Sequence, residues 1–334
     1  MRGVISVLKR ISLLLVCLNA SAWLFAQIPS PALLVLNKSD RTLAVVNPST
    51  LEVVARVATG EDPHEAEASP DGKLAFASDY GGPQGDLHMI SVIDLADLKP
   101  LPPIDLGALR AAHGLEFAGG KLYFTAEGSK AIGSYDPASG RIDWVMGTGQ
   151  DRTHMVKVSR DGRQIYTSNV SSDTISIFDR TSQNGWEQTL VPVGKGPEGF
   201  DVSPDGKELW AANSHDGTIS VIDIASKKVV QTLNIPTKMA NRLKFTPDGK
   251  RVLISDLRSG DLVVVDAGSK KEIKRLKVGS GAAGILVQPD GSRAFVAASP
   301  DNQVAVIDLK TLEISGRISP GKEPDGMAWV SGRK

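Results

Sequence analysis

Residues 199–236 read GFDVSPDGKELWAANSHDGTISVIDIASKKVVQTLNIP, and this stretch decides the fold. An apolar run ends at the turn Pro204-Asp205-Gly206, restarts as LWAAN, and turns again before two alternating segments, TISVID and KVVQTLNI. Each turn contains glycine or aspartate, which tolerate a tight reversal, and each flanking run has the period-2, β-branched character of a strand. The stretch therefore predicts four short antiparallel strands.

The same turn recurs along the chain at a nearly constant spacing. The glycine that ends it lies at positions 72, 120, 162, 206, 249 and 291, in steps of 48, 42, 44, 43 and 42 residues, although the copy at Gly119-Gly120 is degenerate. A period in the forties with four strands per unit is typical of β-propeller blades, because one such sheet cannot bury both faces unless neighbouring sheets pack on it.

The number of blades follows from counting these units. Strand-turn-strand groups begin at positions 33, 74, 122, 165, 209, 252 and 294. The first group lacks an opening strand, and an unused copy of that strand, GMAWV, lies at residues 326–330. We therefore predict an all-β, seven-bladed propeller with four antiparallel strands per blade and almost no helix, closed when the C-terminal strand joins the N-terminal three.

Residues 1–26 predict a secretory signal peptide. Three basic residues precede an apolar run that ends in small residues, and polar residues interrupt that run, so a transmembrane anchor is the weaker alternative. We expect cleavage after Ala26, with Ala22 as the alternative. The only cysteine, Cys17, is then removed, and residues 27–334 form a periplasmic or extracellular domain without a membrane anchor.

The charge pattern excludes one class of partner. The 38 basic and 38 acidic residues balance, and no run of like charges interrupts the repeats. Such a chain has no long-range attraction for nucleic acid, so we expect no nucleic-acid partner, and we expect a monomer.

The segment LWAANSHDGTISVIDIASKKVVQTLNI and its copies resemble the YVTN-type β-propeller repeat of secreted bacterial and archaeal proteins. The resemblance covers nearly all of residues 27–334 and implies the propeller fold. It does not specify a function, because such rings include binding proteins and surface proteins, and related rings include lactonases, lyases and redox enzymes. The second blade departs from the pattern through the insertion DYGGPQGDLHM at residues 79–89, and the third lacks the Pro-Asp-Gly turn.

The start of each innermost strand is the expected place for a site, because loops from all blades converge on the axis there. Aligning the predicted inner strands puts one residue of each blade at this channel mouth: His64, His113, His154, Glu198, Asn241, Ala283 and Asp325. Three of the five histidines occupy this position in consecutive blades. Imidazoles ligate zinc, copper, iron or nickel, so they could bind a divalent metal with Glu198 or Asp325 as oxygen ligand. Alternatively, the histidines bond loop carbonyls and cap the inner strands.

The next positions along these strands predict a polar tunnel. One step deeper, Arg242 stands where four other blades have glycine, at positions 114, 199, 284 and 326, and these glycines are expected to leave room at the axis. Two residues further along each strand come Glu67, Glu116, Lys157, Asp201 and Lys244. The mixed charges are most simply a ring of ion pairs; alternatively, the tunnel receives an anionic or sugar-like ligand at Arg242.

Two functions remain open. The first is a secreted binding or scaffold protein that holds a small molecule, a polymer or a partner protein at the channel mouth. The second is a propeller enzyme of the lactonase, lyase or isomerase type, in which His113 or His154 exchanges a proton, Glu198 poises it and Arg242 binds a carboxylate. A metal ion held by the histidines would instead act as a Lewis acid.

Overall fold

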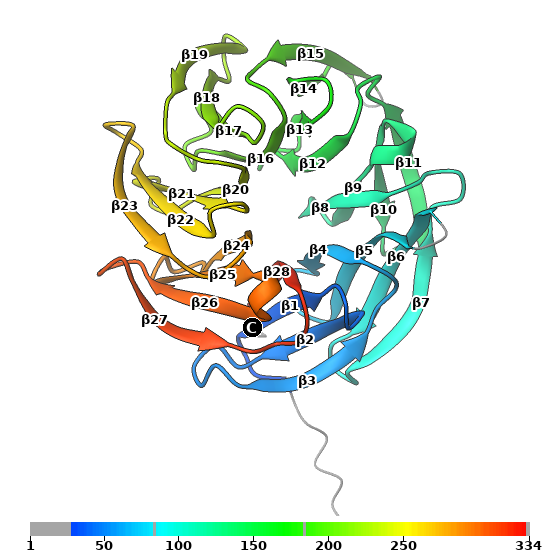
Figure 1. The fold of residues 1–334 in the computed structure, drawn as a ribbon. Coiled ribbons are helices and arrows are strands. Elements are labelled where there is room, and N and C mark those ends of the chain that lie inside the picture. The colour runs from blue at the N-terminus through cyan, green and yellow to red at the C-terminus, as the bar shows by residue number, and fades with distance from the viewer. Residues whose placement is uncertain (1–27, 83–84, 183–184, 332–334) are drawn as a thin grey trace, which may run out of the picture.

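The computed structural model describes residues 28–82, 85–182 and 185–331, and the predicted signal peptide lies outside them. These residues form seven four-stranded antiparallel sheets arranged around one axis (Figure 1). The predicted all-β, seven-bladed propeller is confirmed. Within the described ranges, the helical segments are two 3₁₀ turns, η1 (Glu127–Ser129) and η2 (Ser299–Asp301).

The blades are numbered in chain order, and each is given from its inner to its outer strand. Blade 1 is β28 (Pro324–Val330), β1 (Ala32–Asn37), β2 (Thr42–Val46), β3 (Val53–Ala58); blade 2 is β4 (Pro63–Ala68), β5 (Leu74–Gly82), β6 (Gly85–Asp94), β7 (Lys99–Asp105); blade 3 is β8 (Ala112–Ala118), β9 (Lys121–Ala126), β10 (Ala131–Asp136), β11 (Arg141–Gly147); blade 4 is β12 (Thr153–Val158), β13 (Gln164–Asn169), β14 (Thr174–Arg180), β15 (Trp186–Pro192); blade 5 is β16 (Pro197–Val202), β17 (Glu208–Asn213), β18 (Thr218–Asp223), β19 (Lys228–Leu233); blade 6 is β20 (Ala240–Phe245), β21 (Arg251–Asp256), β22 (Asp261–Asp266), β23 (Lys271–Lys277); blade 7 is β24 (Ala282–Val287), β25 (Arg293–Ala298), β26 (Gln303–Asp308), β27 (Glu313–Ile318).

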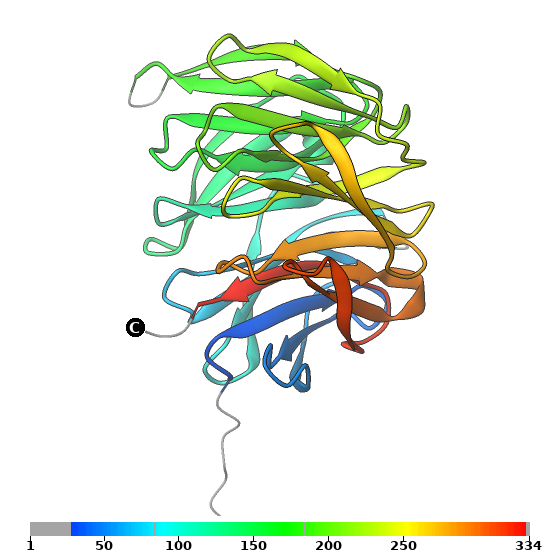
Figure 2. The same cartoon turned by 90° about the vertical axis from the view of Figure 1, so that its left-hand side faces the viewer.

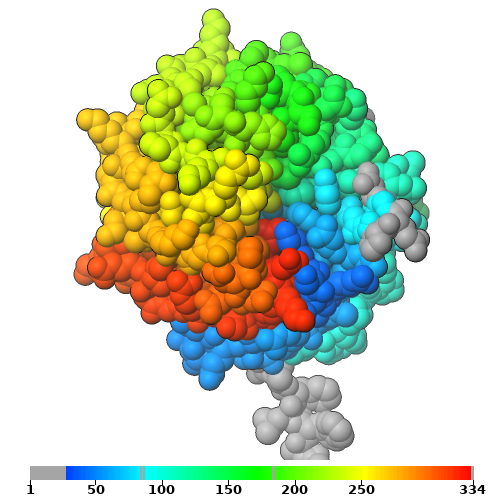
Figure 3. Space-filling model, viewed as in Figure 1, coloured from blue at the N-terminus to red at the C-terminus, as the bar shows by residue number. Residues whose placement is uncertain are grey.

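The ring closes within blade 1, as the sequence predicts. Strand β28 pairs antiparallel with β1, with Ala32 opposite Val330 and Leu34 opposite Ala328. The red C-terminal strand therefore lies beside the blue N-terminal strand in Figure 2, and Figure 3 shows the last blade meeting the first. Each blade consequently has a neighbour on both faces, so no face is left uncovered.

The repeated turn has a physical basis in its own hydrogen bonds. Asp205 Oδ1 accepts from Ser203 Oγ at 2.7 Å and from the Lys207 amide at 3.1 Å. Gly206 lies at φ 74°, a left-handed conformation that glycine adopts without a steric penalty. Turn chemistry therefore explains the Ser-Pro-Asp-Gly-Lys repeat. Side chains between blades supply the core: Trp210 of blade 5, for example, packs edge-on against Phe245 of blade 6, with 5.6 Å between ring centroids.

The glycines at the second inner-strand position do not leave room for a ligand, and that part of the sequence interpretation is wrong. A Cβ on Gly199 would lie 2.5 Å from the carbonyl oxygen of Asn241, and one on Gly326 would lie 2.1 Å from that of His64. Gly114 and Gly284 face the neighbouring inner strand in the same way. The missing side chains let adjacent inner strands approach closely, and this approach brings the residues of the channel mouth together.

At the end of its second strand, blade 2 carries an acid, Asp79, where blades 1, 4 and 5 carry an asparagine. In blade 5, Asn213 Nδ2 donates to Ser220 Oγ at 3.0 Å; in blade 2, Ser91 Oγ donates to Asp79 at 2.9 Å instead. Burial raises the pKa of Asp79 to about 7, despite the hydrogen bond from Ser91 and one from the Gly60 amide. A raised carboxyl pKa means that this group's contribution to stability falls as pH rises from about 4 through 7.

We therefore expect Asp79→Asn to stabilise the protein by at least about 2 kcal/mol more at pH 8 than at pH 4, which is close to the pKa of an unfolded aspartate. Urea unfolding at both pH values measures this. The amide at position 79 would reproduce the blade 5 arrangement, in which Ser220 also accepts a backbone amide from Gly194. Equal destabilisation at both pH values would contradict the assignment.

Candidate functional site

The channel mouth is a rim of seven residues, one from the start of each inner strand. The inner strands contact one another in the ring order β28, β4, β8, β12, β16, β20, β24, which gives the rim order Asp325, His64, His113, His154, Glu198, Asn241, Ala283. The rings of His64 and His113 have centroids 5.0 Å apart, and those of His113 and His154 have centroids 3.8 Å apart. The predicted convergence of the three histidines is confirmed.

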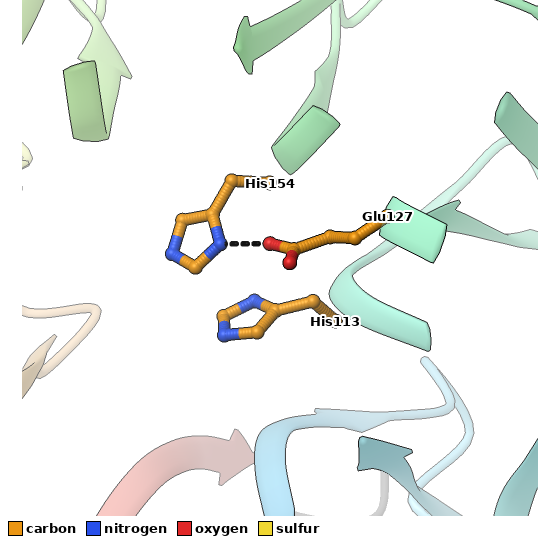
Figure 4. Close-up of side chains that lie close together, drawn as sticks. All are labelled: His113, Glu127 and His154. Atoms are coloured by element: carbon orange, nitrogen blue, oxygen red, sulfur yellow. Dashed lines mark hydrogen bonds and ion pairs between the residues drawn. The ribbon is translucent and has the colours of Figure 1, made fainter. Parts of the chain in front are cut away.

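A carboxylate that the sequence analysis missed completes this row. Glu127 Oε1 accepts a short hydrogen bond from His154 Nδ1, and His113 lies against the same pair (Figure 4). The second carboxylate oxygen, Oε2, accepts from Tyr80 Oη at 2.6 Å and lies 3.7 Å from Arg152 Nε. Both Glu127 and His154 are buried. The Tyr80 hydroxyl and the Arg152 side chain therefore hold this carboxylate against the imidazole of His154.

Glu127 comes from η1, the turn between the second and third strands of blade 3. Because the second strand runs antiparallel to the inner one, that turn lies at the same end of the ring as the start of the inner strand. The sequence does mark this turn as unusual. Blade 3 has Ala-Glu-Gly-Ser at residues 126–129, where blade 5 has Asn-Ser at the equivalent residues 213–214. Alignment of inner strands alone could not reveal it. Tyr80 likewise comes from the end of β5, in the blade 2 insertion.

The electrostatics assign protonation states to the group. Burial by itself raises the pKa of Glu127, but the hydrogen bond and charge of His154, the Tyr80 hydroxyl and Arg152 hold that pKa below its ordinary value. Because the ionised Glu127 accepts from His154 Nδ1, that nitrogen carries a proton, and the neutral form of this imidazole has its lone pair on Nε2. Burial, with the nearby charges of His154 and His64, holds the pKa of His113 well below its usual range, so His113 is neutral at neutral pH.

Two nitrogens of this group are unused. His154 Nε2 and His113 Nδ1 are both buried, and neither has a hydrogen-bond partner among the described residues. Buried polar atoms are normally paired, and exceptions in native proteins mark functional positions. Ligand atoms of His113, Glu127 and His154 all lie within 4.8 Å of one another, so small side-chain rotations would let them share an ion at about 2.1 Å from each ligand. The group could therefore hold a divalent metal.

The other predicted rim residues have protein partners. Glu198 Oε2 accepts from Asn241 Nδ2 at 2.6 Å, and Asp325 Oδ2 lies 3.2 Å from Lys38 Nζ. In ring order these two carboxylates flank the histidine row on its two sides, while the carboxylate that contacts a histidine directly is Glu127. His64 Nδ1 bonds the Asp62 carbonyl oxygen at 2.8 Å, so for this histidine the capping alternative describes the contact.

Arg242 is not at the rim and is already engaged. Its Nε and Nη2 donate to Glu65 Oε1 at 3.1 and 2.5 Å. Strands β20 and β4 are three blades apart in one direction and four in the other, so this ion pair spans the channel beneath the rim. A substrate carboxylate at the mouth would therefore meet Arg152, whose side chain is 45% exposed, before it could reach Arg242.

Comparisons with known proteins identify the family but not the substrate. Residues 85–292, more than half of the chain, match the cytochrome D1 heme domain family. No curated protein matches the sequence. In the part of the chain that the structure describes, no helix is long and apolar enough to cross a membrane.

Solved structures share the fold at low sequence identity. A functionally unknown protein of Desulfotomaculum acetoxidans is 12% identical over 90% of this chain and 99% of its own, with a TM-score of 0.76. The hydrazine synthase of Kuenenia stuttgartiensis is 18% identical over 83% and 92%, with a TM-score of 0.73. The periplasmic gluconolactonase PpgL of Pseudomonas aeruginosa is 16% identical over 90% and 99%, with a TM-score of 0.72. The YVTN-type proteins are thus one part of a broader group of seven-bladed propellers that share this fold. By its sequence match over residues 85–292, the chain belongs to the cytochrome D1 heme domain family.

Proposed function

We propose that the protein is a propeller hydrolase that opens a small polar lactone at the channel mouth, with His154 as the base. The observation that carries this proposal is the buried Glu127–His154 pair, whose Nε2 lone pair is left unused beside His113. A carboxylate that orients an imidazole through Nδ1 and leaves Nε2 to the reaction is the recurring form of a histidine base. The structural likeness to a gluconolactonase agrees with it but shows only a shared fold.

The reaction needs one proton to move twice. His154 Nε2 takes a proton from a water molecule as its oxygen attacks the lactone carbonyl, and ionised Glu127 stabilises the imidazolium that forms. The tetrahedral intermediate then breaks its bond to the ring oxygen, which receives that proton from Nε2. The product is a hydroxy acid, and Arg152, whose Nε lies 3.7 Å from Glu127 Oε2, is an exposed cation that could bind its new carboxylate. A divalent ion bound by the same three side chains would supply Lewis acidity at the carbonyl oxygen.

The family name implies a haem, and the residues present at the mouth do not fit one. His113 and His154 are 2% and 3% exposed, and their ring centroids lie 3.8 Å apart. Neither imidazole therefore presents an open face to a flat macrocycle. Below them the Arg242–Glu65 ion pair crosses the channel, and six ionisable side chains interrupt the apolar lining of the space beyond it, unlike the predominantly apolar walls typical of a cofactor pocket. No step of the mechanism passes through a haem.

The same proposal includes location and partners. We place the enzyme in the periplasm or outside the cell, supported by the signal peptide predicted over residues 1–26. Its partner at the mouth is a small molecule rather than a polymer or protein, because the unused nitrogens of the rim residues His113 and His154 are buried. We propose a monomer: the exposed large apolar side chains of the described residues, Val54, Val145, Leu190, Val230 and Ile273, lie on the outer strands of five different blades.

Lactone hydrolysis by purified protein tests the proposal, after elemental analysis for bound metal. We expect turnover of small sugar lactones in a pH-stat, with kcat lowered about 10²- to 10⁴-fold by His154→Gln. Glu127→Gln should also lower kcat and should shift the pH profile, because an amide cannot stabilise the imidazolium. The matched control is His88→Gln, which removes a partly exposed histidine on the third strand of blade 2 that bonds Asp105 at 2.8 Å.

A folded wild-type protein that binds lactones without hydrolysing them would contradict the enzymatic proposal and favour a binding or scaffold role. Equal activity in His154→Gln and His88→Gln would show that hydrolysis occurs elsewhere.

A further inference from the structure

The channel contains a second compartment that the proposed hydrolase does not use. The Arg242–Glu65 ion pair, with side chains 5% and 15% exposed, crosses the channel directly beneath the histidine rim. Below it lies a cavity of about 250 Å³, lined by the deeper residues of all seven inner strands. We call this space the lower chamber. Its volume equals that of about eight waters at about 30 Å³ each, enough for a ligand of a few non-hydrogen atoms.

Some of the charges around the lower chamber are paired within the protein. Lys157 Nζ lies 3.0 Å from Asp201 Oδ1, and Asp201 Oδ2 also accepts from the Phe245 amide at 2.9 Å. These contacts, like the Arg242–Glu65 pair, tie adjacent or opposite blades together. For these four side chains, the predicted ring of ion pairs describes what the structure contains.

Three charged side chains of the chamber wall have no direct contact with a group of opposite charge among the described residues. Glu67, Glu116 and Lys244 line the chamber without a side-chain hydrogen bond or ion pair to a described residue, although the charges of Lys157 and Lys244 act on Glu67 through space. Arg242 adds a fourth unused group, because its Nη1 is buried and has no partner. The buried Nη1 carries a desolvation cost, which a ligand carboxylate would remove, whereas the partly buried Glu67, Glu116 and Lys244 would exchange water for the charged ends of a ligand.

The acidic and the basic side chains come from strands on different sides of the chamber. Glu67 and Glu116 lie on β4 and β8 of adjacent blades, whereas Lys244 and Arg242 both lie on β20. In the ring order, β20 is three blades from each of the two acidic strands. One wall therefore carries two carboxyl groups and the opposite wall carries Lys244, while Arg242 reaches from that wall across the channel to Glu65 and keeps Nη1 unbonded. A simple anion would meet the carboxyl groups and a simple cation would meet the lysine, so a molecule with both charges fits best.

We propose that the lower chamber is a ligand site for a small zwitterion, an amino acid or related amino carboxylate, with its ammonium group against Glu67 and Glu116 and its carboxylate against Lys244 and Arg242 Nη1. This site is independent of the lactonase proposal, because the ion pair separates it from His154. Each end of such a ligand would form charge-assisted hydrogen bonds, the stronger class in proteins.

Ionisation of Glu67 should make the affinity for the zwitterion depend on pH. Burial raises the pKa of Glu67 to about 8, and the charges of Glu116 and Glu65 act in the same direction, whereas Lys244 and Lys157 oppose them. Glu67 is therefore neutral at pH 6.5 and increasingly ionised above pH 8. An ammonium group gains a charged partner as pH rises through this range, so zwitterion affinity should increase between pH 6.5 and 8.5.

Calorimetric titration of the full-length mature protein with 4-aminobutanoate tests the proposal. Butanoate and butylammonium, each with one of the two charges, should bind at least about tenfold more weakly. Lys244→Met should weaken 4-aminobutanoate at least about tenfold and leave butylammonium unchanged, and Glu116→Gln should weaken both amines. The control is Lys250→Met, which removes an exposed lysine from a turn. His154→Gln should bind 4-aminobutanoate like wild type.

Three outcomes would overturn the site: no heat from any zwitterion at about 10 mM with folded wild-type protein, equal affinity for butanoate and 4-aminobutanoate, or affinity that does not rise with pH. The pH measurement uses the unchanged protein, so it decides the question even where a variant fails to fold.

Discussion

Removing β28, by ending the chain at residue 323, should lower Tm by at least about 10 °C or abolish cooperative unfolding. This strand is the inner strand of blade 1 and pairs with β1 along most of its length. It also buries Met327, Ala328 and Val330, and a buried apolar side chain contributes about 1 to 3 kcal/mol. Without it, β1 becomes an unpaired edge beside the axis, and blades 2 and 7 lose a neighbour.

The control for that truncation is a chain that ends at Ser331, which keeps every ladder pair of β28. Its Tm should equal that of the full chain in differential scanning calorimetry. If the shorter chain, ending at residue 323, also melts at the wild-type temperature, closure through β28 does not stabilise the ring.

Gly199→Ala and Gly326→Ala should each destabilise the protein by about 3 to 5 kcal/mol. The added methyl groups would lie 2.5 and 2.1 Å from backbone carbonyl oxygens of the neighbouring inner strand, and backbone atoms of a packed ladder cannot move aside as a flexible side chain can. Spreading the strands at Gly326 would also displace His64, because its carbonyl is the atom that the methyl group meets.

Gly147→Ala is the matched control for these substitutions. Gly147 is also a strand glycine, but it lies at the end of outer strand β11, and a Cβ there meets no atom within 4 Å. Its replacement should change the free energy of unfolding by no more than about 0.5 kcal/mol in urea denaturation. Comparable losses at positions 147, 199 and 326 would mean that close approach of the inner strands is not the cause.

The fold could be predicted from the sequence because each of its determinants is local or repeated. Turn glycines such as Gly206, alternating runs such as TISVID and the leftover strand GMAWV specify blade, period and closure without knowledge of any long-range contact. The histidine rim could be predicted for the same reason. Equivalent positions of stacked blades must share a circle, so the proximity of His64, His113 and His154 follows from register alone.

What could not be predicted depends on distances between elements. Glu127 reaches His154 from a turn of the neighbouring blade, and only the separation of the two blades determines that contact. The side chains of Arg242 and Glu65 meet because the channel is narrow, and the width of the channel cannot be read from the sequence. The inner glycines allow close strand packing rather than open space at the axis, and a sequence does not show which atoms would lie beside an absent Cβ.

The pairing of β28 with β1 also sets the order of events during synthesis. Three strands of blade 1 lie at the start of the chain and its fourth lies at the end, so the first three leave the ribosome long before β28 is synthesised. Until the last strand is made, β1 exposes its edge, and the ring can close only as a late, long-range step of the kind that makes β proteins slow to fold. A chain of this design therefore stays open at blade 1 until its synthesis is complete.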